Sequence, residues 1–294
     1  MAVAALLVAS SARAGGPPAQ KLPSALLVFP LVQVSGDQET RIELVNLSGS
    51  PQWIQCFYVD GGFCGETGFM VLLTPYQPMA WRVSAGLSDP LTGTAVPPFF
   101  GTGELKCGVV PPRPEVEFHN TIQGRATIVS SSTGQTVSYG AVGFQRLSDG
   151  DFTGVFSLDG STYAQCPNKL HFDVLTDQPT SASQIVVVPC TQDLLTQTPT
   201  AVSVQILVYN EFEQGFSSSY GLRCFDERSI SEVSSALTRA VAGTDTAHLV
   251  VRGVGGPVLG LVIDQVSFQG TLGTAGNEPS FEGGRSATVT FPTP

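Results

Sequence analysis

Apolar and polar residues alternate with a period of two along much of the chain. Ile42 and Leu44 alternate with polar neighbours, and the same alternation returns in residues 54–58. This periodicity is typical of strands that bury one face. Because Leu-Ser-Gly-Ser-Pro at 47–51 is a turn sequence, the segment 41–60 predicts two strands joined as a hairpin.

A similar pattern occurs in both halves of the chain. A strand that ends in Asn is followed by a Cys-Phe pair at 42–46 and 54–57, and again at 204–210 and 222–225. A Val-x-Pro element precedes both copies, at 28–30 and 187–189. The order of these elements predicts a duplicated β unit.

Other short alternating segments are separated by turn residues, as in antiparallel sandwiches. The chain has 294 residues, with 32 Gly and 21 Pro, and this length favours two domains. The Gly- and Asp-rich stretch 147–165 separates them. We therefore predict an all-β fold of two tandem antiparallel β-sandwich domains of the immunoglobulin-like type, at 15–160 and 161–294, related by internal duplication.

The first residues indicate export. Residues 2–9 are a short apolar run, and Ala-Arg-Ala at 12–14 matches the small-x-small pattern that signal peptidase cleaves after. We predict a signal peptide at 1–14 and an extracytoplasmic location, which is secreted, periplasmic or at the cell surface. No apolar run is long enough to predict a membrane span, and the net charge of −10 disfavours nucleic acid as a partner.

The chain has 6 cysteines, an even number that favours disulfides in an exported protein. Cys56–Cys107 and Cys190–Cys224 are the simplest pairings, because each would close within one predicted domain. Cys64 and Cys166 are left without an assigned pairing.

Motifs for catalysis or metal binding are scarce. The chain has 3 histidines, His119, His171 and His248, and their spacing matches no common metal-ligand motif. Asp149, Asp151 and Thr153 resemble the first half of a calcium-binding loop, although the match is imperfect and a plain Asp/Gly turn is the favoured interpretation. We therefore expect no catalytic site and no cofactor. A structural zinc site is not expected either, because the chain has no C-x-x-C motif, and calcium is the remaining metal candidate.

Aromatic residues offer one candidate for ligand binding. Phe99 and Phe100 follow two prolines at the end of a long predicted loop, where an exposed ring could stack on a sugar. Tyr58 and Trp81 fall on the apolar phase of predicted strands and are expected to fill the core. Phe99 and Phe100 are thus the predicted ligand-contact residues.

The two copies of Val-x-Pro, the Asn-ending strand and Cys-Phe resemble exported bacterial β proteins of uncharacterised function that are built of tandem immunoglobulin-like sandwiches. The resemblance covers about half of the chain. It implies a secreted or envelope-associated protein that is structural or adhesion-type and not an enzyme, with a protein or a glycan at a cell surface as the partner. The alternative is a carbohydrate-binding protein that uses its loop aromatics.

Overall fold

The structure is a computed structural model that describes residues 22–89, 93–110, 120–149, 153–268 and 271–292. Strands make up 64% of it and helices 4%, so the all-β prediction is confirmed. The predicted signal peptide at 1–14 lies outside the described residues. Within them, no helix is both long enough and apolar enough to cross a membrane.

The first half of the chain builds two sheets. Sheet A has the order β11 (Val142–Phe144), β1 (Leu26–Val34), β8 (Gly101–Val109), β3 (Gln52–Asp60) and β4 (Glu66–Leu73). Sheet B has the order β10 (Thr136–Gly140), β9 (Ile122–Ser130), β2 (Gln38–Asn46) and β5 (Pro78–Arg82). A ribbon of β6 (Leu87–Asp89) and β7 (Thr94–Val96) lies beside β4.

The second half builds two further sheets, and a small sheet joins both halves. Sheet D has the order β17 (Gly215–Leu222), β16 (Val202–Asn210), β19 (Thr246–Val254), β13 (Cys166–Leu175) and β22 (Ser280–Arg285). Sheet E has the order β18 (Asp226–Ser229), β14 (Ser181–Pro189), β20 (Val258–Phe268) and β21 (Thr271–Asn277). Sheet C contains β12 (Val155–Leu158), β23 (Ala287–Thr290) and β15 (Gln192–Asp193). Three short helical turns, α1 (Ile230–Val233), η1 (Ser235–Leu237) and α2 (Arg239–Ala242), follow β18.

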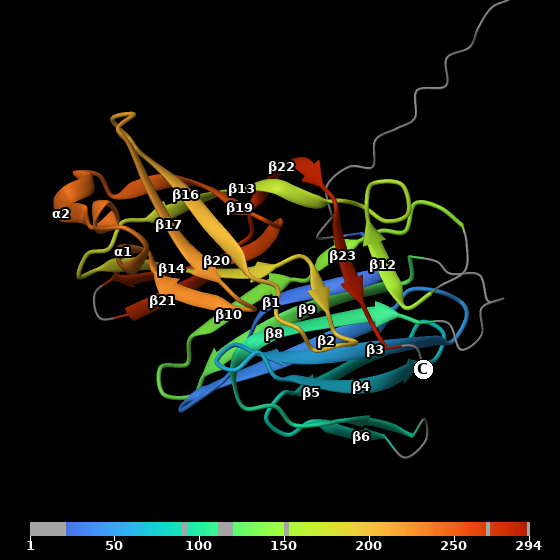
Figure 1. The fold of residues 1–294 in the computed structure, drawn as a ribbon. Coiled ribbons are helices and arrows are strands. Elements are labelled where there is room, and N and C mark those ends of the chain that lie inside the picture. The colour runs from blue at the N-terminus through green and yellow to red at the C-terminus, as the bar shows by residue number, and fades with distance from the viewer. Residues whose placement is uncertain (1–21, 90–92, 111–119, 150–152, 269–270, 293–294) are drawn as a thin grey trace, which may run out of the picture.

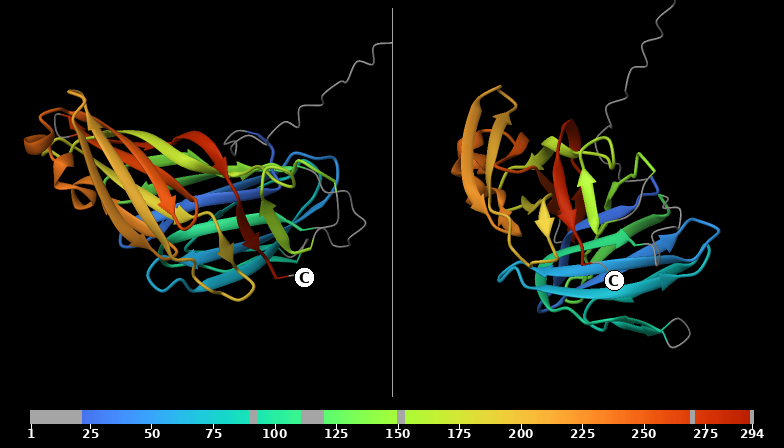
Figure 2. Two further views of the ribbon diagram at one scale, coloured as in Figure 1. Left: turned by 45° about the horizontal axis from the view of Figure 1, so that its top comes forward. Right: turned by 45° about the vertical axis from the view of Figure 1, so that its right-hand side comes forward.

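Figure 1 shows the strands of the second half lying against those of the first, with the helical turns at one end. Two further views in Figure 2 show β12 and β23 side by side, where they pair in antiparallel fashion. The predicted domain boundary at 160 falls between β12 and β13. Sheet C therefore pairs a strand that precedes this boundary with strands that follow it.

Sheet A is buried on both faces, as the continuous apolar run in β1 requires. Residues 26–32 of β1 are all buried. On one face, Phe29 lies against Gly124 of sheet B. On the other face, the ring of Phe57 packs edge-on against Phe291, which follows β23, with centroids 5.1 Å apart. Strands that are apolar at every position occur where both faces of a sheet are covered.

Sheet E also separates two cores. Ile185 and Val187 of β14 belong to a core cluster shared with sheet D. Val186 and Val188 point the opposite way and belong to the larger cluster shared with sheets A and B. Alternate residues of β14 therefore serve different cores: the first core lies wholly within the second half of the chain, whereas the larger core contains residues of both halves.

The prediction of two tandem immunoglobulin-like sandwiches related by duplication is therefore wrong. In the described part of the chain, the strands form five sheets of three to five strands and one two-stranded ribbon. Sheet A packs against sheet B on one face and against sheet C on the other, and sheet E lies between the core that it shares with sheet D and the core that it shares with sheets A and B. The strand order within them is not a simple meander, since β1 pairs with both β8 and β11. Strands with two apolar faces must lie inside such a stack, which excludes a pair of separate sandwiches.

The predicted hairpin at 41–60 is also wrong. Although β2 and β3 follow one another in sequence, β2 pairs with β5 and β9 of sheet B, and β3 pairs with β4 and β8 of sheet A. The turn between them carries the chain from one sheet to the other. In the second copy, by contrast, β16 does pair with β17 in one sheet.

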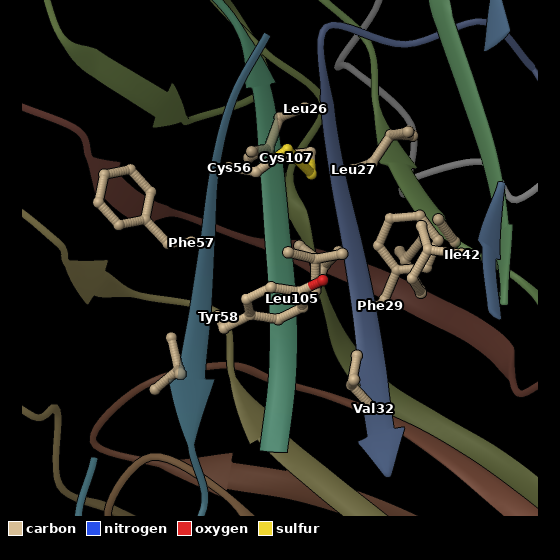
Figure 3. Packing of buried hydrophobic residues seen from close by; sticks show 14 of the residues in the cluster. Leu26, Leu27, Phe29, Val32, Ile42, Cys56, Phe57, Tyr58, Leu105 and Cys107 are labelled. Atoms are coloured by element: carbon tan, nitrogen blue, oxygen red, sulfur yellow. A yellow bond between two sulfur atoms is a disulfide. The ribbon is translucent and has the colours of Figure 1, made fainter. Parts of the chain in front are cut away.

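Three disulfides cross-link the described strands and loops. Cys56–Cys107 joins the adjacent strands β3 and β8 inside the core, with Cα atoms 4.1 Å apart, as Figure 3 shows. This predicted pairing is confirmed. The predicted Cys190–Cys224 bond is wrong, because Cys190 bonds to Cys166 and Cys224 bonds to Cys64. The Cys64–Cys224 bond links the two halves of the chain, whereas both bonds that the sequence analysis assigned would close within one half.

Candidate functional site

A groove of about 710 Å³ lies on the outer face of sheet B. Strands β2, β5 and β9 form its floor, and Glu278, which follows β21, lines one side. The alternation along β2 decides which of its side chains face the groove. Ile42 and Leu44 are buried in the core, so Arg41 and Glu43 point outward. Gly124 of β9 lies in the floor, where any Cβ atom would clash with Phe29 beneath it.

The rim of the groove carries opposite charges. Glu43 accepts hydrogen bonds from Arg125 Nε at 3.2 Å and Nη2 at 2.6 Å. Arg41 Nε approaches the other carboxylate oxygen of Glu43 at 3.4 Å. Glu43 thus holds two guanidinium groups beside a largely apolar floor that includes Val45 and Ala80.

One wall of the groove comes from the far half of the chain. The backbone N–H of Gly140 donates to Glu278 Oε1 at 2.8 Å, and Thr274 Oγ1 donates to the carbonyl of Thr136 at 3.1 Å. These bonds hold β21 and the residues after it against β10. The groove therefore depends on the packing of both halves.

A second polar cluster is buried where sheet A meets sheet C. Lys106 and Glu104 are fully buried and form an ion pair at 2.5 Å. Lys106 Nζ also donates to Gln192 Oε1, and Gln192 Nε2 lies 3.5 Å from Glu66 Oε1. Burial raises the pKa of Glu104 and lowers the pKa of Lys106. This cluster connects β8 with β15.

The free energy of unfolding is expected to depend on pH through Glu66. Burial raises the pKa of Glu66 from 4.5 to about 7. Between these values the folded protein keeps a proton that the unfolded chain has released, so the contribution of Glu66 to stability falls as pH rises through this window and stays constant above it. Urea unfolding at pH 5 and pH 8 should show a smaller loss of stability for Glu66→Gln than for the unchanged protein. Equal losses for both proteins would contradict the assignment.

The structure separates the two predicted ligand-contact residues. Phe99 is 8% exposed and stacks on Tyr58, with ring centroids 5.0 Å apart, so it belongs to the core. Phe100 is 66% exposed. The expectation of an exposed ring at Phe99 is wrong because the N–H of Phe99 donates to the carbonyl of Val83, the residue after β5 of sheet B, and this holds the ring against Tyr58 of sheet A.

The predicted calcium loop is only partly described. Asp149 and Thr153 are described, but Asp151 lies outside the described residues. Over the part of the chain that is described, no group of three or more His, Cys, Asp or Glu side chains is placed to hold a metal ion. The calcium site therefore stays a prediction.

Sequence reasoning missed the residues that line the groove. Arg41 and Glu43 are outward positions of a predicted strand, but nothing in the sequence places Arg125 or Glu278 beside them. Residues 46–48, Asn-Leu-Ser, match the sequence that N-glycosylation requires. Asn46 is fully buried, however, and its Nδ2 donates to the carbonyls of Ser50 and Thr74. An attached glycan would require that side chain to leave its site.

Comparisons with known proteins give no family. No family model matches the chain, and no curated protein matches it. One similar solved structure is described as the crystal structure of Thermotoga maritima 1070, with 8% sequence identity, a TM-score of 0.32, and coverage of 40% of this chain and 97% of that chain. A similarity at this level carries no conclusion about fold or function.

Proposed function

We propose that this protein is a secreted or envelope-associated, non-enzymatic protein of the structural or adhesion type. It binds an extended segment of a protein partner in the groove on sheet B. The groove carries this proposal, because its volume of about 710 Å³ and its apolar floor with a charged rim are typical of ligand-binding clefts. The three disulfides support an extracytoplasmic location.

The charges of the rim favour a partner segment with an acidic side chain next to apolar ones. Arg125 presents a planar fork of donors, which pairs well with a carboxylate. The protein as a whole is acidic, with a net charge of −10, so two arginines on one face stand out from their surroundings. A partner carboxylate could share them with Glu43 while apolar side chains cover Val45 and Ala80.

Filling the groove is expected to abolish this binding. Ala80 lines the floor opposite Glu43 on the neighbouring strand, and Ala80→Trp would occupy the space that a partner side chain needs. Peptides selected from a displayed random library against the disulfide-bonded protein should bind Ala80→Trp at least about tenfold more weakly, a loss of about 1.4 kcal/mol. Fluorescence anisotropy with the selected peptides measures this loss.

Arg82→Ala is the matched control, since Arg82 lies on the same face of β5 as Ala80 but does not line the groove. It should bind the selected peptides as the unchanged protein does. Selected peptides that bind Ala80→Trp with undiminished affinity would contradict the groove as the binding site, as would a selection that enriches no peptide at all.

The alternative is carbohydrate binding, and a different surface favours it. A hollow of about 450 Å³ is lined by Asp60, Phe63, Phe225 and Glu227, among others. Phe63 is 90% exposed, and its N–H donates to Asp60. Exposed rings beside carboxylates suit a ligand rich in hydroxyl groups. Glycan-array binding that is lost in Phe63→Ala and kept in Ala80→Trp would favour this alternative.

A further inference from the structure

Two histidines and two carboxylates form a continuous row on the outer face of sheet D. Asp173 Oδ1 lies 2.8 Å from His248 Nδ1. The other nitrogen of that ring, Nε2, lies 3.2 Å from His171 Nδ1. His171 Nε2 in turn lies 2.8 Å from Glu282 Oε2. The row therefore has three close contacts between electronegative atoms.

Strand pairing places these residues together although they are far apart in the chain. Strand β13 lies between β19 and β22. Asp173 is directly opposite His248 across one ladder, and Lys169 is directly opposite Glu282 across the other. Because positions 169, 171 and 173 alternate to the same face of β13, His171 lies between the two pairs. Lys169 Nζ also contacts the Glu282 carboxylate at 2.7 Å.

With both rings neutral, the row has one hydrogen too few for its three contacts, so a proton or another cation is missing from it. Each of its three contacts needs a hydrogen between the two atoms that face each other. Two neutral imidazole rings supply one N–H each, and ionised carboxylates supply none. If both N–H groups face the carboxylates, the lone pairs of His171 Nδ1 and His248 Nε2 face each other across 3.2 Å. Any other placement of the two hydrogens leaves a ring lone pair against a carboxylate.

We propose that the facing nitrogens of His171 and His248 bind a divalent transition-metal ion of the zinc, nickel or copper class. Two imidazole nitrogens on a tetrahedral zinc ion, with bonds of about 2.0–2.1 Å, are about 3.3 Å apart. The present separation of 3.2 Å is close to that value. Neutral imidazole is the ligand that these ions share.

The carboxylates complete the environment of such a site. A metal-bound histidine usually donates its other N–H to a carboxylate, which fixes the ring and makes it a stronger ligand. Asp173 and Glu282 stand at these positions for His248 and His171 respectively. The His248 side chain is 42% exposed and the His171 side chain 24% exposed. The remaining coordination positions thus face solvent, where water or a group from another molecule can occupy them.

Titration of the full chain without a purification tag tests this site. Calorimetry with ZnCl₂ alone should show one ion bound per chain. His171→Ala and His248→Ala should each weaken binding at least about tenfold, and Asp173→Asn should weaken it about 10–100-fold. His119→Ala, which removes the remaining histidine, is the matched control and should bind as the unchanged protein does. Circular dichroism would verify that each variant is folded.

A second measurement distinguishes a metal from a proton. With CuCl₂, electron paramagnetic resonance should show two imidazole nitrogens on the bound ion, and acidification should release it because protons compete for the same nitrogens. Zinc or copper binding that persists unchanged in the His171→Ala, His248→Ala double variant would overturn the proposal. So would the absence of any metal binding together with nuclear magnetic resonance signals of one proton shared by the two rings.

Discussion

Lys106→Met is expected to lower the free energy of unfolding by about 3–5 kcal/mol, the usual cost of leaving one partner of a buried ion pair without the other. Both Lys106 and Glu104 are fully buried, and one carboxylate oxygen of Glu104 already has no hydrogen-bond partner. Removal of the ammonium group would leave the Glu104 carboxylate and the amide oxygen of Gln192 buried without the donor that they share. Urea unfolding followed by tryptophan fluorescence measures the change.

The matched control is the double variant Lys106→Met, Glu104→Leu. Replacing a buried ion pair by apolar residues of similar size is often neutral, so the double variant should recover most of the stability lost by the single one. Lys169→Met is a second control, because Lys169 pairs with Glu282 at the surface and exposed pairs contribute about 0–1 kcal/mol. A loss below about 1 kcal/mol for Lys106→Met would contradict the importance of this pair.

Removing the Cys64–Cys224 bond is expected to have the second largest effect on stability. A Cys64→Ser, Cys224→Ser variant should lose about 2–4 kcal/mol, because its unfolded chain is freed from a constraint between distant residues. The two cysteines are 160 residues apart in sequence, and their bond joins the turn after β3 to the segment after β17. Thermal unfolding monitored by circular dichroism would measure the loss.

Cys166→Ser, Cys190→Ser provides the comparison, since these residues are only 24 apart in sequence. The chain-entropy relation gives about 1.7 kcal/mol less stabilisation for the shorter loop. A larger loss for the Cys166–Cys190 variant would show that packing around that bond, and not loop length, decides its contribution. It would contradict the role of Cys64–Cys224 as the stronger constraint.

The asparagine of the repeated sequence motif forms the same type of turn in both halves of the chain. Asn46 Oδ1 accepts the N–H of Ser48 at 2.9 Å, and Asn210 Oδ1 accepts the N–H of Phe212 at 3.0 Å. Both asparagines therefore close the turn after their strand. This could be predicted because an Asx turn depends on residues two positions apart. The partner of the next strand depends on the whole sheet, and there the two copies differ.

Candidate site residues were predictable only where they depend on local pattern. Period-two alternation places Arg41 and Glu43 on the outer face of their strand, but no sequence signal joins them to Arg125. The Phe99–Phe100 pair shows the opposite error. A loop rich in Pro predicts exposure for both rings, yet Phe99 is covered by Tyr58, a contact that depends on how the loop returns to sheet A.

The amino-acid sequence by itself determined that the chain is nearly all-β, since alternation of side chains and turn residues acts over a few positions. It also indicated the Cys56–Cys107 bond and showed that β1 is apolar at nearly every position and that β14 has an apolar run at 185–189. Only the tertiary structure decided what covers these strands. The stacking of five sheets, the groove that needs Glu278 from the far half, and the meeting of His171 with His248, 77 residues apart, all arise from side-chain packing between distant segments. Such packing leaves no periodic signal in the sequence.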